Sequence, residues 1–381
     1  TQEGGVRAVY EQTITVPASW NDYNAYLHME GVGDDYTVFI NGTQISQPVD
    51  KYTPSEFFIS PYLDQGDNTL AIVVVAEPYM ATIAEDITTA KRAQFSNCYI
   101  FAQRKLGIYD FNVRLVPDSL ARFAQLQLDV AVDNSFSTDE VIEVGYDIYA
   151  PDGKLMEYSV NDLAMTGFTR DTMSFTPWIY HSNPNRWSPS NPKLYDLMLY
   201  IKRNGMLWEY IPLKIGFGKT EYRDGKFYRF DKPLTIQKKE HFNAMPNRQQ
   251  TFKEIEQLKL RGYNTVCPDY PQPKWFYDMC DKAGMFVIDR ANINAPAKHN
   301  DRGICGTPSN VPELVDEYLT RVKSMYYRSR NHSCIIAFAL GGDESGNGYN
   351  MYKAYEWLKS VEKERPVIYL GTEGEWNTDL Q

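Results

Sequence analysis

Two adjacent carboxylates, Asp343 and Glu344, follow an apolar segment and stand inside a glycine-rich turn. The apolar segment, residues 334–340, predicts a buried strand, and the turn runs from Gly341 to Gly346. A carboxylate at the C-terminal end of a barrel strand faces the active site, and partial desolvation there raises its pKa so that it acts as a general acid. The structural alternative is that Asp343 or Glu344 caps the helix expected next.

The elements expected around this pair alternate between strand and helix. Strands and helices are predicted at residues 234–238, 249–261, 264–267, 274–283, 285–288, 312–330, 334–340, 349–363 and 367–370, beginning with a strand. Strands that read as apolar runs between helices predict a parallel sheet buried on both faces. Five strands and four helices make the first half of a TIM barrel, which typically needs about 250 residues in full. We therefore expect a fragment of a longer chain, with an open doubly wound sheet as the alternative.

The part of the chain before this region reads as two β-sandwiches. Residues 6–16 alternate between apolar and polar, and Asn41-Gly42 between two β-rich runs is a strong hairpin signal. A second all-β stretch over about residues 108–218 has the length of an immunoglobulin-like sandwich. The predicted domains are residues 1–106, 107–220 and 221–381.

Composition and charge exclude several classes of function. The net charge is −10, and without a basic stripe this argues against nucleic acid and anionic membrane surfaces as partners. No run of eighteen apolar residues predicts a transmembrane helix, and no signal peptide is visible, so a periplasmic or a cytoplasmic location both remain open. The 5 cysteines are irregularly spaced, which favours buried free thiols over disulfides or a zinc site. No motif predicts a cofactor or a metal centre.

Several motifs in collinear order resemble family 2 glycoside hydrolases, and β-galactosidases in particular. The acidic pair and its strand resemble the acid/base motif of that family, including the Arg-Asn-His sequence that precedes the strand. The segments that carry the resemblance are residues 10–17 with Trp20, 38–42, 62–70, 187–195, 216–218, 275–293, 330–346 and 365–367.

The resemblance implies a fold and a set of site residues. The fold would be a sugar-binding, jelly-roll-like β-sandwich, an immunoglobulin-like β-sandwich and the first half of the TIM barrel. Glu344 would be the general acid/base of a retaining hydrolysis. Asp343 would stand where the family has an Asn that contacts the sugar 2-hydroxyl. His241 would retain part of an Arg-His-Glu-His pattern, Asp269 would stand in a His-Tyr-Pro triplet, and Glu373 would lie at the end of the fifth strand on the substrate side.

The sequence also departs from the family pattern. One extra residue lies between Leu340 and Glu344, and Cys267 stands where the family has an arginine. Asn294 and Pro296 replace the Glu and His of the magnesium site found in some members, so we expect that site to be lost. The nucleophile of the family lies on the seventh strand, beyond the residues of this chain.

Two functions follow as expectations. The first is hydrolysis of terminal β-linked sugars, above all galactosides, from oligosaccharides with retention, in an intact protein of which this chain lacks the nucleophile half. The second is a catalytically inactive carbohydrate-binding or scaffold homologue, motivated by the several changed site positions. A third hypothesis is an unrelated all-β adhesin with an α/β appendage. The expected partner is a carbohydrate, and a homo-oligomer is left open.

Overall fold

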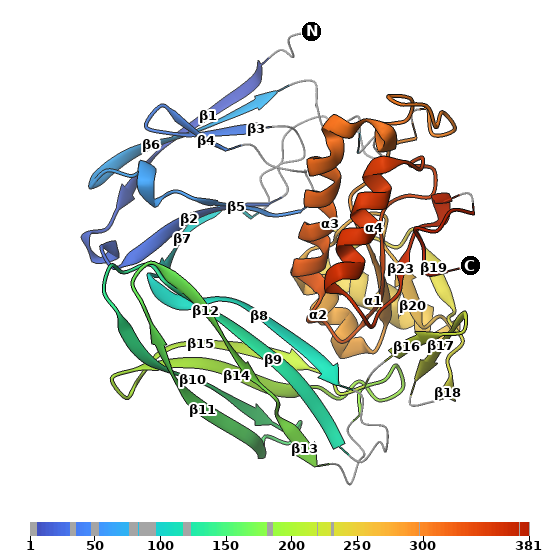
Figure 1. Ribbon diagram of the computed structural model, residues 1–381, viewed down its shortest axis with the longest axis horizontal. Helices are drawn as coiled ribbons and strands as arrows, with labels where there is room; N and C mark the ends of the chain where they lie inside the picture. Colours follow the sequence, from blue (N-terminus) through green and yellow to red (C-terminus); the bar gives the residue numbers. More distant parts are fainter. Residues whose placement is uncertain are drawn as a thin grey trace.

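The computed structural model describes residues 6–30, 36–46, 53–75, 83, 97–116, 123–180, 186–218, 220–229, 232–296, 298–372 and 374–380. Figure 1 shows two β-rich units followed along the chain by an α/β unit whose helices face the first β-rich unit. Within the described residues, no helix combines the length and the apolar composition needed to cross a bilayer.

The first unit is a sandwich of two antiparallel sheets. Its core contains alternate residues of facing strands, such as Leu27, Met29, Val38 and Val74. The predicted hairpin is confirmed, because Asn41 and Gly42 have φ angles of 50° and 78° between β3 and β4. In spatial order the sheets contain β1 (Val6–Val16), β6 (Gly66–Val75), β3 (Tyr36–Ile40) and β4 (Thr43–Ser46), and then β5 (Ser55–Phe58), β2 (Tyr23–Met29) and β7 (Tyr99–Arg104).

The second unit is also a sandwich, and the alternation predicted for its strands is confirmed. Leu126, Leu128, Val130 and Val132 of one strand all point into its core. One sheet contains β11 (Leu155–Met165), β10 (Glu140–Tyr149), β14 (Tyr195–Arg203) and β15 (Met206–Ile215); the other contains β12 (Thr169–Phe175), β9 (Phe123–Asn134) and β13 (Trp178–Tyr180), with β8 (Leu106–Val116) paired to β9. A small sheet of β16 (Thr220–Arg223), β17 (Lys226–Arg229) and β18 (Lys232–Pro233) leads to the third unit.

The third unit is a parallel sheet whose strands follow one another in chain order. A doubly wound sheet would reverse its order at a switch point, so the sequential order identifies half of a barrel and excludes the alternative. The elements are β19 (Lys238–Glu240), α1 (Arg248–Leu260), β20 (Thr265–Cys267), α2 (Lys274–Ala283), β21 (Phe286–Arg290), α3 (Val315–Ser329), β22 (Ile335–Ala339), α4 (Tyr349–Val361) and β23 (Val367–Ile368).

The first and last barrel strands differ from their predictions. The first was expected at residues 234–238 but begins at Lys238, because the Leu234 amide donates to the Phe227 carbonyl of β17 instead of joining the barrel sheet. The fifth was expected to reach Leu370 but ends at Ile368, and a 3-10 turn follows at Leu370–Thr372.

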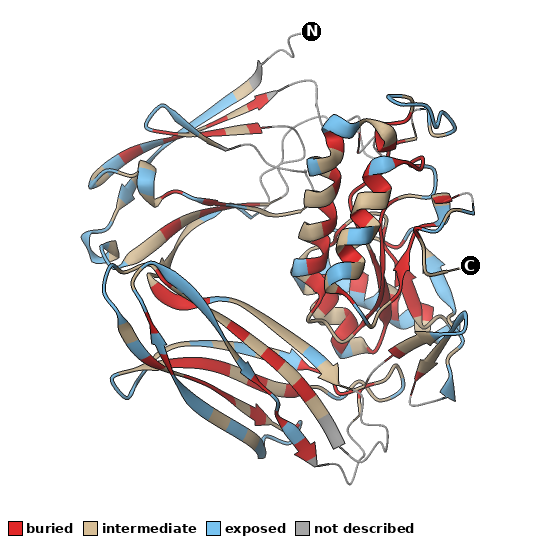
Figure 2. Cartoon of the chain, in the orientation of Figure 1, coloured by how far each residue is buried: buried red, intermediate tan, exposed pale blue. Residues whose placement is uncertain are grey.

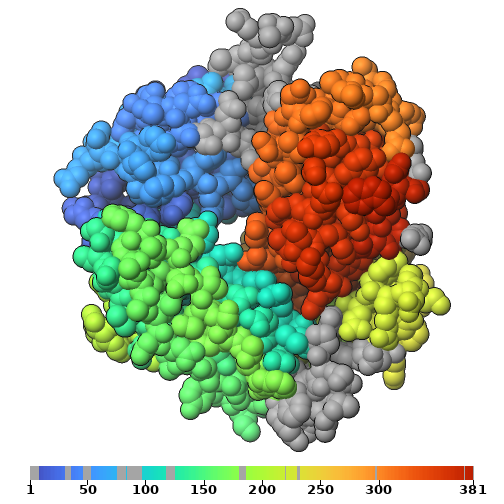
Figure 3. All heavy atoms as spheres, in the orientation of Figure 1, coloured from blue at the N-terminus to red at the C-terminus, as the bar shows by residue number. Residues whose placement is uncertain are grey.

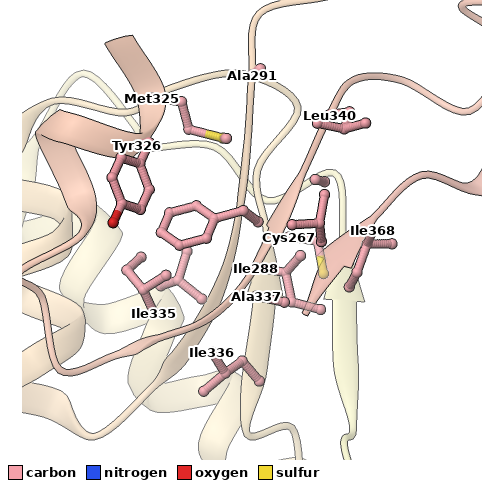
Figure 4. Close-up of a cluster of buried hydrophobic side chains, with 14 of the residues drawn as sticks. Cys267, Ile288, Ala291, Met325, Tyr326, Ile335, Ile336, Ala337, Leu340 and Ile368 are labelled. Carbon is pink, nitrogen blue, oxygen red and sulfur yellow. The ribbon is translucent and has the colours of Figure 1, made fainter. Parts of the chain in front are cut away.

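The barrel core explains why the strand before the acidic pair reads as an unbroken apolar run. All five residues of β22 are buried, since both of its faces are covered. In Figure 4, Met325 and Tyr326 of α3 lie on one side of β22, and Cys267, Ile288 and Ile368 gather on the other. Figure 2 shows the same pattern, with buried residues on the helix faces that pack on the sheet.

Trp187 joins the second sandwich to the barrel. Its side chain is fully buried, and its indole N–H donates to the Asp281 carbonyl oxygen at 2.7 Å. The ring meets Phe286 of β21 edge to face at 5.6 Å between centroids. An added Cβ at Gly216 would lie 2.6 Å from this ring, so the backbone approaches it as closely as a glycine allows.

We predict that Trp187→Ala lowers the free energy of unfolding by about 3–5 kcal/mol, because it removes a large buried ring and leaves a cavity. Leu260→Ala is the control, since Leu260 is 80% exposed, and its effect should stay within about 0.5 kcal/mol. Urea denaturation of the two variants measures the difference. Equal losses would mean that Trp187 does not hold the junction.

The cysteines only partly follow the expectation of buried free thiols. All five are free among the described residues, and Cys267, Cys280 and Cys334 are buried, but Cys98 and Cys305 are exposed. The exposed pair corrects the prediction: both lie in irregular segments, where a side chain has no sheet or helix to cover it. Burial, together with the charge of Glu240, raises the pKa of Cys267 to about 12.

We expect the folded protein at pH 8 to react with iodoacetamide at Cys305 and not at Cys267, because only a thiolate is alkylated and a pKa of about 12 leaves almost none at Cys267. Peptide mass spectrometry gives the extent of labelling at each position. Unfolding in guanidinium should make both cysteines reactive. Rapid labelling of Cys267 in the folded protein would contradict its burial.

Candidate active site

The strand that delivers the acidic pair is anchored to the second sandwich just before it begins. Arg330 donates to both carboxylate oxygens of Asp110 at 2.8 Å and to the Phe111 carbonyl at 2.8 Å. The Asn331 side chain accepts from the Val113 amide at 2.9 Å and donates to the Phe111 carbonyl at 3.1 Å. These contacts join β8 to the residues just before β22 and fix the N-terminal end of that strand.

The next residues anchor the same strand to α2 and β15. Nδ1 of His332 lies 2.7 Å from the Asp281 carboxylate, whose other oxygen accepts from the Cys334 amide at 2.7 Å. The Ser333 hydroxyl accepts from the Gly216 amide at 2.7 Å. The Arg-Asn-His-Ser sequence is thus a structural junction, and the acidic pair lies at the far end of the strand that it holds.

At that far end, the loop is fastened to the end of β21. The Gly342 amide donates to the Ile293 carbonyl at 2.8 Å, and a Cβ on Gly341 would stand 2.8 Å from the same oxygen. The Ser345 hydroxyl donates to that carbonyl at 3.2 Å and accepts from the Ala295 amide at 3.3 Å. The loop is therefore rigid on both sides of the acidic pair.

The acidic pair itself is exposed between these anchors. The alternative that one of the two caps α4 is wrong, because Gly348 is the N-cap residue and the helix has no side-chain cap. Within the described part of the chain, neither Asp343 nor Glu344 has a side-chain hydrogen bond or an ion pair. Two carboxylates held on a rigid loop without internal partners are available to a ligand.

A charged cluster covers the ends of the first three strands. Lys238 lies 2.6 Å from the Glu240 carboxylate. Arg290 of β21 lies between two acids, 3.9 Å from Glu240 and 3.7 Å from Asp269. Nδ1 of His241 is 2.6 Å from the same Asp269. The cluster therefore contains positive and negative groups in close pairs.

The pKa values follow from these pairs. Burial opposes ionisation of Glu240, but the hydrogen bond and charge of Lys238 and the charge of Arg290 outweigh it, so the pKa of Glu240 is lowered. The hydrogen bond to Glu240 raises the pKa of Lys238, and the charge of Asp343 adds to that effect. Asp343 therefore lies within the field of Lys238, which links the acidic pair to the charged cluster.

The sequence-predicted residues are distributed as follows. His241 and Asp269 are in direct contact, and Asn243 donates to Asp269 at 2.8 Å from the segment after β19. The His241 side chain is 76% exposed and so is open to a ligand. Asp343 and Glu344 lie together at the end of β22. Glu373 lies outside the described residues.

Sequence reasoning missed three members of this region, namely Lys238, Arg290 and Asn243. For Arg290 the available signal was a charged residue at the end of a strand that is otherwise buried, whereas Lys238 lies in a strand of three charged residues and gave no such signal. Glu375, two residues further along the chain than Glu373, is paired with Arg302 at 3.0 Å.

One group of described side chains has the spacing of a metal site, but its chemistry does not fit one. Ligand atoms of Asp278, Asp281 and His332 lie within 4.8 Å of one another. However, Lys274 already lies 2.9 Å from Asp278, and both oxygens of Asp281 are bonded, to His332 and to the Cys334 amide. The group therefore stabilises the junction at the N-terminal end of β22.

Three family models match consecutive parts of the chain. They are the sugar binding domain of glycosyl hydrolases family 2 at residues 2–104, the glycosyl hydrolases family 2 model at residues 107–217, and the family 2 TIM barrel domain at residues 237–380.

Similar proteins agree with these models. The chain is 27% identical to a β-galactosidase of Streptococcus thermophilus, over 100% of this chain and 37% of that protein. It is 26% identical to a β-galactosidase of Priestia megaterium, over 95% and 36% respectively. The chain thus spans little more than a third of the length of these curated relatives.

Solved structures show the same fold. A β-glucuronidase of Bacteroides uniformis superposes with a TM-score of 0.78 at 20% identity, covering 94% of this chain and 46% of that one. A β-glycosidase of Bacteroides vulgatus superposes with a TM-score of 0.74 at 20% identity, covering 97% and 46%. Taken together, the consecutive family models, the relatives and the fold place this chain in family 2 of the glycosyl hydrolases.

Proposed function

We propose that the intact protein hydrolyses terminal β-linked sugars, β-galactosides above all, with retention of configuration, and that Glu344 is its general acid/base. The observation that carries the proposal is Glu344 itself, an unpaired carboxylate on a rigid loop at the C-terminal end of a barrel strand. Active sites of such barrels are built at that end of the strands. The similarity to β-galactosidases suggests the sugar.

The neighbouring groups have roles that suit a sugar substrate. Asp343 and the exposed His241 ring offer hydrogen bonds to hydroxyl groups, and Asp269 orients that ring through its 2.6 Å contact. Because Lys238 pairs with Glu240 and Arg290 lies near Asp269, these partly buried acids are poor candidates for proton transfer. Glu344 remains the carboxyl group best placed to protonate a glycosidic oxygen and later to activate water.

Retention requires a second carboxylate about 5 Å from the first. Apart from Asp343 on the same loop, the charged cluster at the strand ends offers Glu240 and Asp269, and each is engaged with cations. We propose that the nucleophile comes from a later barrel strand and that these 381 residues alone bind sugar without turnover.

A catalytically inactive carbohydrate-binding homologue is the second candidate. Cys267 favours it, because a buried thiol with a pKa of about 12 stands where the resemblance implies an arginine. Arg290 lies close by on β21 and supplies a positive charge to the same cluster, which weakens this candidate.

We predict that Glu344→Gln, made in the longest form of the protein obtainable from its source, lowers kcat/KM for aryl β-galactosides by about 100- to 10,000-fold, because the amide can neither donate nor accept the proton. Initial rates of nitrophenol release measure the effect, and azide should restore part of the rate with an activated leaving group.

Glu356→Gln is the matched control, since Glu356 is an exposed α4 residue paired only with Lys353, and it should keep full activity. Unchanged hydrolysis in Glu344→Gln would show that another group is the acid/base. Sugar binding without turnover in the longest form would favour the inactive homologue.

A further inference from the structure

A cleft lies between the first sandwich and the outer side of the barrel. Its volume is 920 Å³, and it is lined by residues of β2 and β7 on one wall and by the segments that lead into α1 and α2 on the other. Figure 3 shows an opening at this place, between the blue first sandwich and the orange part of the barrel. None of Asp343, Glu344, His241 or Asp269 lines the cleft, so it is separate from the candidate active site.

Aromatic rings form part of the first wall. Tyr99 of β7 is 45% exposed, and its ring lies parallel to His28 at 4.7 Å. The ring centroid of Phe101 lies 5.9 Å from that of Tyr99, and the Tyr26 ring stacks on Phe101 with 5.4 Å between their centroids. These side chains point away from the sandwich core, which takes the alternating residues of β2. Of these rings, Tyr99 and His28 line the cleft, and Phe101 and Tyr26 continue the row along the same face of the sheet.

The opposite wall carries Trp275 at the start of α2. The guanidinium of Arg248 lies 5.3 Å from the centre of the Trp275 ring and holds its orientation. Tyr270 and Gln272 lie in the same wall, and the Gln272 amide donates to the Tyr270 carbonyl at 2.6 Å. Two aromatic walls face each other across a space whose volume falls within the range of about 300–1,000 Å³ typical of ligand pockets.

The charges in the cleft are of both signs. Glu30 accepts from the Asn97 amide at 3.1 Å, and Lys274 lies 2.9 Å from Asp278. The lining carries the cations Arg248, Lys274 and Arg328 and the acids Glu30 and Asp278, and this mixture of signs does not select a strongly charged ligand. These side chains do offer donors and acceptors to hydroxyl groups beside aromatic faces that contact apolar C–H groups.

We propose that this cleft is a second carbohydrate-binding site, which takes a neutral oligosaccharide between Tyr99 and Trp275. Sugar rings combine an apolar face with a rim of hydroxyl groups, and the cleft combines aromatic faces with paired polar groups. The site holds a sugar chain beside the βα loops of the barrel, away from Glu344. Its role is binding, so it is independent of whether the protein is an active hydrolase.

The test uses the 381-residue chain with β-1,4-galactotetraose and cellotetraose as probes in isothermal titration calorimetry. Binding is expected for at least one probe, and Tyr99→Ala and Trp275→Ala should each weaken it by tenfold or more. Tyr158→Ala is the matched control, because Tyr158 is a 65% exposed aromatic on the second sandwich, and it should bind like the parent chain. Because the candidate active site is also proposed to bind sugar, only the binding that is lost in Tyr99→Ala and Trp275→Ala is assigned to the cleft.

A second measurement needs no substitution. Cys98 is exposed beside Tyr99, so a bound oligosaccharide should slow its alkylation by severalfold while Cys305, on the barrel, reacts at the same rate. The proposal would be overturned if neither probe bound. It would also be overturned if a probe bound equally well to Tyr99→Ala and Trp275→Ala and left the alkylation rate of Cys98 unchanged. Binding of an unstructured aromatic peptide in place of both sugars would overturn it too and would identify the cleft as a protein-docking surface.

Discussion

The structure depends above all on the bonds that residues 330–334 make at the base of β22. Arg330 and Asn331 hold β8 of the second sandwich, Ser333 holds the end of β15, and His332 and Cys334 hold Asp281 of α2. Arg330 is buried, and its charge is matched by Asp110, which keeps the cost of desolvating the ion low. Because the strand starts from this junction, the position of its other end is fixed relative to both neighbouring units.

Groups of different charge lie around the C-terminal end of this fixed strand. The acids on the first two strand ends are paired with Lys238, Arg290 and His241, whereas Glu344 stands on a loop fastened through its backbone and Ser345. The loop needs no help from the carboxylate side chains to keep its shape. A carboxylate that is not used for folding is free to be used for chemistry.

Much of the fold could be predicted from the sequence because its signals are local. Apolar strand runs, the Asn41-Gly42 hairpin and the helix over residues 274–283 depend on neighbouring residues and were placed to within a few positions. Contacts between distant segments carry no such signal: the Arg330–Asp110 pair spans 220 residues, and the Tyr99–Trp275 cleft exists only after two units pack. The first barrel strand was misplaced for the same reason, since Leu234 pairs with β17 rather than with the barrel sheet. Of the site, the acidic pair could be recognised, but the cations of its neighbours could not.

The glycine pair before Asp343 bears on how such genes change over time. The resemblance implies one additional residue in this loop, and the structure puts Gly341 and Gly342 against the Ile293 carbonyl, where a methyl group would already be crowded. The ladder between β21 and β22 has a register shift between Val287 and Ile288 and is then continuous to the Arg290–Ala339 pair, where β22 also pairs with β23. The chain therefore has two places that can take up an additional residue without breaking the sheet, the irregularity within β22 and the glycine pair that follows the strand.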